Sequence, residues 1–452
     1  MAYSTMRHMV LSGGHPLTRW TRLPGPRGWV PLFWFITALI CLPVWYSFLA
    51  GTLGTHCAQI FAIGDHYIWA TVCAGLAIVL LSIGGYNFLE KAQLIILGLM
   101  LIGVFVAVFW IRPDWLSVVQ GLFLPRPLEY PEWALNKLGE TLRQRSPWVE
   151  IMLYAAAIGG QALDYLGYVS FLRDKNWGRS HLGTASSKEL QAISAQPDHP
   201  ARLWVRAAII DSVTSFAMVL LIAVAFSILG AEILRTQQLV PNDTELVSHQ
   251  AAFLTTLSPW LKPLYNLAVF LAFFGILYGG PEVAYRVFYE FFRSVPRWQD
   301  RTDFKPLRAV TIAWCLVGGV ILLWLSKRYP GVQLIDIVTP AGIYTGVLSC
   351  SFYCFANPWI DKRFLPPPLR MPKSLAVLNG IAGTLFLAAG SKALWDYGKP
   401  SLPVFVTREW GIPGQLGAFL TFGAVLLASF VLAMALGRFY QEPTSEADLQ
   451  SR

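Results

Sequence analysis

The sequence contains few charged residues and no long polar stretch that could cover a soluble domain. Asp, Glu, Lys and Arg make up 13% of its 452 residues, whereas soluble domains carry about 25%. Hydrophobic residues make up 55%. A chain with so few charges cannot surround an apolar core with a solvated surface, so the sequence excludes an ordinary soluble enzyme or regulatory domain.

Motifs for soluble-enzyme chemistry are also absent. There is no Walker-type glycine loop with a lysine, no G-x-S-x-G and no H-E-x-x-H. The six cysteines are scattered and form no C-x-x-C pair, which argues against a zinc site or a disulfide framework. The seven histidines do not cluster within apolar segments. We therefore expect no enzymatic activity, no cofactor and no direct use of ATP by this chain alone.

Long apolar segments occupy most of the chain instead. A helix needs about 20 apolar residues to cross the hydrocarbon core of a bilayer, and ten segments meet this requirement. They are predicted at Trp29–Leu53, Tyr67–Asn87, Ala92–Ile111, Val149–Phe171, Leu203–Ile233, Pro263–Val287, Ala309–Ser326, Val332–Asn357, Ser374–Leu394 and Gly414–Gly437. The second and third leave only Phe88–Lys91 as a tight turn. The predicted fold class is all-α, a multi-pass membrane protein with one transmembrane domain over residues 1–440.

Basic residues are distributed unevenly between the loops. If the amino terminus is cytoplasmic and the spans alternate, roughly two thirds of the 35 Lys and Arg lie on the cytoplasmic side. This distribution predicts that the protein lies in the cell (inner) membrane with both termini in the cytoplasm. It also accounts for the net charge of +9 without nucleic acid as a partner. The lipid bilayer is the expected environment, and no protein partner is indicated. Residues 441–452 are expected to form a disordered cytoplasmic tail.

The fourth predicted span contains the strongest candidate site. Gly159, Gly160 and Gln161 follow Ala156, and Asp164 comes about one turn later. Paired glycines with polar neighbours at mid-membrane depth predict a broken helix, and transporters bind substrates where such a helix frees backbone carbonyls and amides. An alternative is a packing face of small residues, at which two helices approach closely.

Polar side chains in two other spans are secondary candidates, because such groups are costly at membrane depth. Asp336, Thr339 and Tyr344 lie around Pro340 in the eighth span, where a proline removes a backbone hydrogen bond and hydroxyls could serve as ligands. Glu282 lies near the end of the sixth span. The alternatives are a proline kink with satisfied hydroxyls and, for the two acids, a capping or interfacial carboxylate.

Several stretches together resemble the Nramp-type divalent metal transporters, which share the LeuT-like fold. Arg7–Leu17 resembles the family's cytoplasmic segment between its second and third helices, and Tyr86–Lys91 resembles the turn between its fourth and fifth. Ala156–Gln161 falls where the sixth family helix is unwound. Asp164–Tyr168 with Arg173–Lys175 resembles the continuation of that helix in a bacterial subgroup. The resemblance extends over most of the chain and marks it as a divergent member.

The resemblance implies that the ten spans are the third through twelfth helices of the family. The first family helix carries an Asp-Pro-Gly-x-x-x-Asn-type metal site, which has no counterpart in this sequence. We therefore expect an incomplete LeuT-like inverted-repeat fold that lacks the first two family helices. One alternative is a truncated membrane protein that transports nothing, and another is a permease for amino acids or other small solutes.

The resemblance also implies a secondary transporter that moves divalent metal ions by alternating access at the broken helix, in symport with protons. Ala156 would supply a backbone carbonyl, and the Gly159–Gln161 segment replaces the family's Met-Pro-His signature. A thioether favours soft metals, so its absence favours oxygen ligands and Mg²⁺ or Mn²⁺, with Fe²⁺ as a further candidate. The expected transport site comprises Ala156, Gly159, Gly160, Gln161 and Asp164.

Overall fold

Helices are the regular elements of the part of the chain that the structure describes. The computed structural model describes the backbone of residues 1–83, 86–124, 127–138, 146–239, 246–295, 304–328, 334–397 and 414–440. Every regular element in these ranges is a helix, which confirms the predicted all-α fold class. The tail predicted at residues 441–452 lies outside the described residues.

All ten predicted spans correspond to helices. Over the described residues, eight of these helices are long and apolar enough to cross a bilayer. They are α3 (Trp29–Phe61), α4 (His66–Ile83), α5 (Tyr86–Ile111), α12 (Pro200–Leu229), α15 (Lys262–Arg293), α16 (Phe304–Ser326), α19 (Lys373–Tyr397) and α21 (Gly414–Leu436). The fourth and eighth predicted spans are each divided into shorter helices.

The two divided spans have different interruptions. The fourth consists of α9 (Pro147–Gly159) and α10 (Ala162–Asp174), separated by two residues. The eighth consists of α17 (Leu334–Gly342), the π-helix η4 (Ile343–Leu348) and α18 (Ser349–Phe364). A π-helical turn within an α-helix often marks a functional position, and η4 packs directly against α9.

The turn predicted at Phe88–Lys91 is wrong. α4 ends at Ile83 and α5 begins at Tyr86, so Phe88–Lys91 belongs to the first turns of α5. The sequence has Gly84 and Gly85 between these helices, and glycine is a poor helix former. The prediction gave too much weight to the charged pair that follows and too little to the paired glycines.

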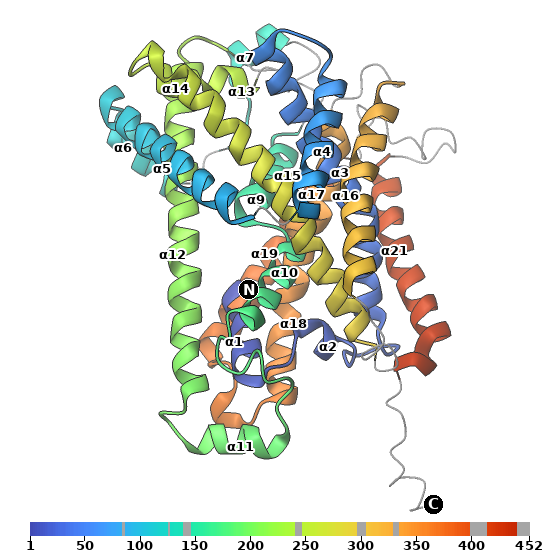
Figure 1. The fold of residues 1–452 in the computed structure, drawn as a ribbon. Coiled ribbons are helices and arrows are strands. Elements are labelled where there is room, and N and C mark those ends of the chain that lie inside the picture. The colour runs from blue at the N-terminus through green and yellow to red at the C-terminus, as the bar shows by residue number, and fades with distance from the viewer. Residues whose placement is uncertain are drawn as a thin grey trace, which may run out of the picture.

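Short helices lie toward the two ends of the bundle (Figure 1). α7 (Glu132–Leu138), α13 (Leu246–Gln250) and α14 (Ala252–Thr255) lie at one end, and α11 (Ser187–Ala195) lies at the other. The remaining short elements are α1 (Ala2–Ser12), α2 (Pro16–Trp20), α6 (Trp115–Phe123), η1 (Gly230–Leu234), η2 (Pro259–Leu261), η5 (Pro367–Leu369) and η6 (Gly437–Tyr440). This placement agrees with the predicted alternation, which assigns α7, α13 and α14 to outer loops and α11 to an inner loop.

α3 is the central element of the bundle and packs against α4, α15, α16, α17 and α21. Its small and aliphatic residues, such as Ala50 and Leu53, meet Phe274 and Leu277 of α15 and Leu316 of α16 in one buried cluster. All six cysteines are buried and free, and they pack in the bundle as small apolar residues. The central position of α3 brings its middle turns beside the interruption in the fourth span.

Candidate functional site

The fourth span is interrupted at its pair of glycines. α9 ends at Gly159, and Gly160 has φ 76° and ψ 163°, a conformation essentially restricted to glycine. In the described part of the chain, no backbone hydrogen bond continues α9 past its end. The carbonyl of Ala156 does not accept a hydrogen bond from the N–H of Gly160. The interruption therefore lies within the stretch where the sequence predicted a broken helix.

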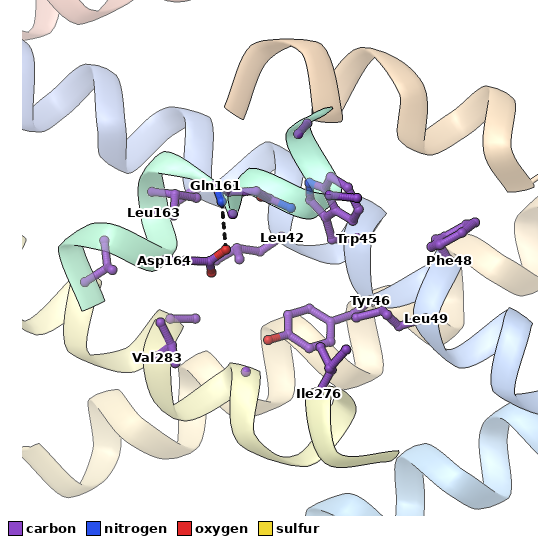
Figure 2. A pocket seen from close by; sticks show the side chains of 17 residues that line it. Leu42, Trp45, Tyr46, Phe48, Leu49, Gln161, Leu163, Asp164, Ile276 and Val283 are labelled. Atoms are coloured by element: carbon purple, nitrogen blue, oxygen red, sulfur yellow. Dashed lines mark hydrogen bonds between the residues drawn. The ribbon is translucent and has the colours of Figure 1, made fainter. Parts of the chain in front are cut away.

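Asp164 caps the helix that follows the interruption. The backbone N–H of Gln161 donates to Oδ2 of Asp164 at 3.0 Å, as Figure 2 shows. A carboxylate in the first turn is also stabilised by the partial positive charge of a helix amino terminus. The Asp164 side chain nevertheless remains exposed. This residue therefore combines a structural role at the start of α10 with an accessible negative charge.

The side chain of Gln161 is held by the eighth span. Its Oε1 accepts a hydrogen bond from the Thr345 hydroxyl at 3.0 Å, and Trp45 of α3 donates its indole N–H to that hydroxyl at 3.4 Å. Thr345 is fully buried within η4. Because Pro340 lacks the backbone N–H that a regular helix needs, the ladder is disturbed just before η4. The π turn then places Thr345 against Gln161.

Small residues allow α9 and η4 to cross closely at this point. A Cβ atom at Gly346 would lie 2.2 Å from the Cβ of Ala156, so the crossing leaves no room for a side chain at Gly346. Across the interruption, the Tyr165 hydroxyl donates to the carbonyl of Gly159. The two alternatives weighed for this stretch are therefore both present, because Ala156 packs against a neighbouring helix and Gly160 ends its own.

A cavity of about 300 Å³ lies on one side of the interruption, between α3, α10 and α15. Figure 2 shows the carboxylate of Asp164 directed into this space. Most of the wall is apolar, and Trp45, Tyr46 and Phe48 contribute aromatic rings. Among the described residues that line the cavity, Asp164 carries the only carboxylate. Ala156, Gly160 and Gln161 border the same space.

A second cavity, of about 360 Å³, lies on another side of the interruption. Gly159, Gly160 and Tyr165 border it together with Ser212 of α12 and Met1. Gly160 thus lies between two cavities, whereas Gly159 belongs to the second. Met1 lies beside the interruption, and the opposite end of α1 packs against the loop that precedes α11.

The secondary candidates are not brought to the first cavity. Buried Thr339 donates its hydroxyl to the carbonyl of Ile335 at 2.6 Å, and Tyr344 stacks on Phe422. Glu282 forms an ion pair with Arg308 of α16. Asp336 lies in α17, but its side chain is outside the described part of the structure. Thr339 therefore fits the alternative of a proline kink with satisfied hydroxyls, and the ion pair with Arg308 accounts for Glu282.

Trp45 and Tyr46 were missed by the reasoning from sequence. They follow Pro43 in the first span, and nothing in an apolar run indicates which face of a helix lines a cavity. The proline was the available signal, since helix irregularities often accompany functional positions. The contact of Thr345 could not be predicted, because its hydrogen bond to Gln161 joins residues far apart in the chain.

Comparisons with known proteins agree with this architecture. A family model described as Nramp, natural resistance-associated macrophage protein-like, matches residues 9–339, more than half of the chain. No curated protein matches the chain. Structures of a manganese transporter from Eremococcus coleocola are similar in fold. One mutant gives a TM-score of 0.60 at 12% identity over 97% of this chain and 86% of that one. A complex with an aromatic bis-isothiourea-substituted compound gives 0.57 at 12% identity over 97% and 87%.

Proposed function

The chain belongs to the Nramp family of divalent metal transporters, and from this premise we propose that it moves a hard divalent cation across the membrane by alternating access at the interruption between α9 and α10. It is an integral multi-pass transporter and not an enzyme. The observation that carries the proposal is the interrupted helix itself, whose capping carboxylate, Asp164, is directed into a cavity.

The oxygen atoms around the first cavity support a hard cation as substrate. Asp164 offers a carboxylate, Gln161 an amide, and Ala156 a carbonyl that does not accept a hydrogen bond from the Gly160 N–H. Mg²⁺ and Mn²⁺ prefer oxygen ligands, whereas a thioether selects softer metals. We therefore propose Mg²⁺ or Mn²⁺ as the substrate, with Fe²⁺ as a further candidate.

The positions of the glycines support separate roles for the residues of the proposed site. Gly160 borders both cavities and Gly159 borders the second. We propose that the ion binds on the side of Asp164 and that the interruption supplies the hinge between two access states. Gly159 would then contribute to transport as part of the wall of the second cavity, and it would not contact the ion in the first cavity.

Proton coupling is part of the same proposal. Asp164 is the carboxylate that lines the first cavity in the described part of the chain, so it is the group that could take up a proton when the ion leaves. Carboxylates at membrane depth commonly serve as proton relays in transporters. We also propose the cell (inner) membrane as the location, with α11 and the end of α21 on the cytoplasmic side, where basic residues are concentrated.

The proposal is tested by ion uptake into liposomes that contain the purified protein. Asp164→Asn preserves an oxygen that can accept the Gln161 N–H but removes the charge, whereas Asp164→Ala removes both. If the carboxylate binds the ion, both variants lower Mn²⁺ uptake by roughly tenfold or more, because losing a charged partner costs about 1.5–3 kcal/mol. Asp114→Asn is the matched control, since Asp114 caps α6 at 3.0 Å far along the chain from the cavity.

Two results would contradict the proposed site. Normal uptake by Asp164→Asn, with loss confined to Asp164→Ala, would reduce Asp164 to a helix cap. Absence of divalent flux in the parent and in all variants would favour a permease for amino acids or other small solutes. The specific observation in favour of that alternative is the wall of Trp45, Tyr46 and Phe48, because apolar and aromatic linings are typical of sites for small organic molecules.

A further inference from the structure

Two cysteines from neighbouring helices lie close together in the core of the bundle. The Sγ atoms of Cys57 in α3 and Cys73 in α4 are 4.0 Å apart, and both side chains are buried in the same cluster as Cys315. Neither thiol lines the first cavity. Reasoning from sequence did not indicate the contact, because the two cysteines are 16 positions apart in different predicted spans.

A close crossing of α3 and α4 brings the two thiols together. Gly54 lies one turn before Cys57, and a Cβ atom there would be 2.3 Å from the carbonyl oxygen of His66 and 2.9 Å from the Cβ of Ala70. Ala70 lies one turn before Cys73. A disulfide bond is about 2.05 Å long, so the sulfur atoms must approach by about 2 Å to form one. The small residues at the crossing therefore place the pair within reach of a bond.

The pair lies near the end of α3 that the predicted alternation places outside the cytoplasm. Cys57 is one turn before Phe61, the last residue of α3, and the exposed segment 59–64 begins directly beyond that turn. Compartments outside the cytoplasm are oxidising, and disulfides form and persist there. Local opening at the end of a helix requires little free energy. An oxidant can therefore reach the thiols from the loop between α3 and α4.

From this geometry we propose that Cys57 and Cys73 are a redox-active pair that forms a disulfide bond between α3 and α4. The oxidant is itself a disulfide, of a small molecule or of a thiol oxidase. The thiolate of one cysteine attacks it, forms a mixed disulfide and releases one thiol of the oxidant. The second thiolate then attacks the mixed disulfide and releases the other thiol. Two electrons and two protons pass from the protein thiols to the two thiols that are released.

The bond would join α3 to α4 beside the helix that lines the first cavity. α3 contributes Trp45, Tyr46 and Phe48 to that cavity. A disulfide also closes a loop of the chain, which restricts the unfolded state more than the folded one. The oxidised protein should therefore unfold at a higher temperature than the reduced protein. The proposal does not depend on which solute the protein transports.

The experiment counts free thiols in the full-length protein in detergent. The purified protein is treated with oxidised glutathione, denatured and labelled with a maleimide that adds a mass tag to each free thiol. The reduced parent should take a tag on each of its six cysteines, and oxidation should remove two of these tags. Peptide mass spectrometry of the oxidised parent should identify two peptides, one with Cys57 and one with Cys73, linked by a disulfide.

Two variants separate this pair from the other buried cysteines. Cys57→Ala should no longer lose two tags on oxidation, because Cys73 has no partner. Cys315→Ala is the matched control from the same buried cluster and should still lose two. An oxidised parent that keeps all its tags would overturn the proposal, as would loss of two tags from Cys57→Ala. The linked peptides of the parent decide between these results even if a variant does not fold.

Discussion

Two residues at the interruption, Asp164 and Gly160, each satisfy two requirements. Asp164 accepts the Gln161 N–H and also exposes its charge to the first cavity. Gly160 adopts a backbone conformation closed to other residues and also borders both cavities. Gly346 allows the close approach of Ala156. The stretch could be recognised in the sequence because paired glycines stand beside an amide and a carboxylate, and ionisable groups are costly at membrane depth.

Gly160→Ala tests whether the conformation of the interruption is required. We expect it to destabilise the protein by about 1–3 kcal/mol, the usual cost of a side chain in a conformation reserved for glycine, and to lower ion uptake. Crowding is not the cause, because the new Cβ would lie 3.5 Å from its nearest neighbour, the Tyr165 hydroxyl. Thermal unfolding and liposome uptake measure the two effects.

Gly159→Ala is the matched control for this substitution. Gly159 is the last residue of α9, and a Cβ atom there meets nothing within 4 Å. It should therefore retain a thermal stability close to that of the parent. Equal losses for both variants would show that the positive φ at Gly160 is not the critical feature of the interruption.

At the scale of helices, hydrophobic length predicted the existence of the spans better than their ends. α3 extends to Phe61, eight residues past its predicted end at Leu53, and α15 extends to Arg293 rather than Val287. A helix continues after its apolar segment leaves the hydrocarbon core, because water satisfies its exposed side chains. The π turn of η4 was not predicted, since Pro340 indicates an irregularity but not its form.

The crossing of α9 and η4 gives a prediction at this scale. Gly346→Ala would place a Cβ atom 2.2 Å from the Cβ of Ala156, so the two helices must separate. We expect a loss of about 1–3 kcal/mol, typical of overpacking in a closely packed core. Gly380→Ala in α19 is the control, because a Cβ atom there meets nothing within 4 Å. Thermal unfolding that is the same for both variants would contradict the close crossing.

For the whole molecule, the distribution of basic residues predicts a side of the membrane but not how those residues assemble. The sequence does not distinguish Arg19, Arg22 and Arg27 from the other basic loop residues. In the fold, they line one pocket beside Ser294 and Tyr440. These contacts join the two ends of the chain and depend on the packing of α3, α15 and α21. Periodicity and composition contain no information on such contacts, whereas each of the ten apolar segments that they indicate corresponds to helix in the structure.

The orientation of the molecule can be tested with two single cysteines. Leu128 lies between α6 and α7 and is 38% exposed, and Lys188 lies exposed in α11 near the opposite end of the bundle (Figure 1). Because all six native cysteines are buried, a membrane-impermeant maleimide should label the parent protein weakly. In intact cells it should label Leu128→Cys, and it should label Lys188→Cys only after the membrane is permeabilised. Labelling of both variants from the same side would contradict the alternation of ten spans. If Lys188→Cys is labelled in intact cells and Leu128→Cys only after permeabilisation, the fold is retained but its orientation is the reverse of that predicted by the positive-inside distribution.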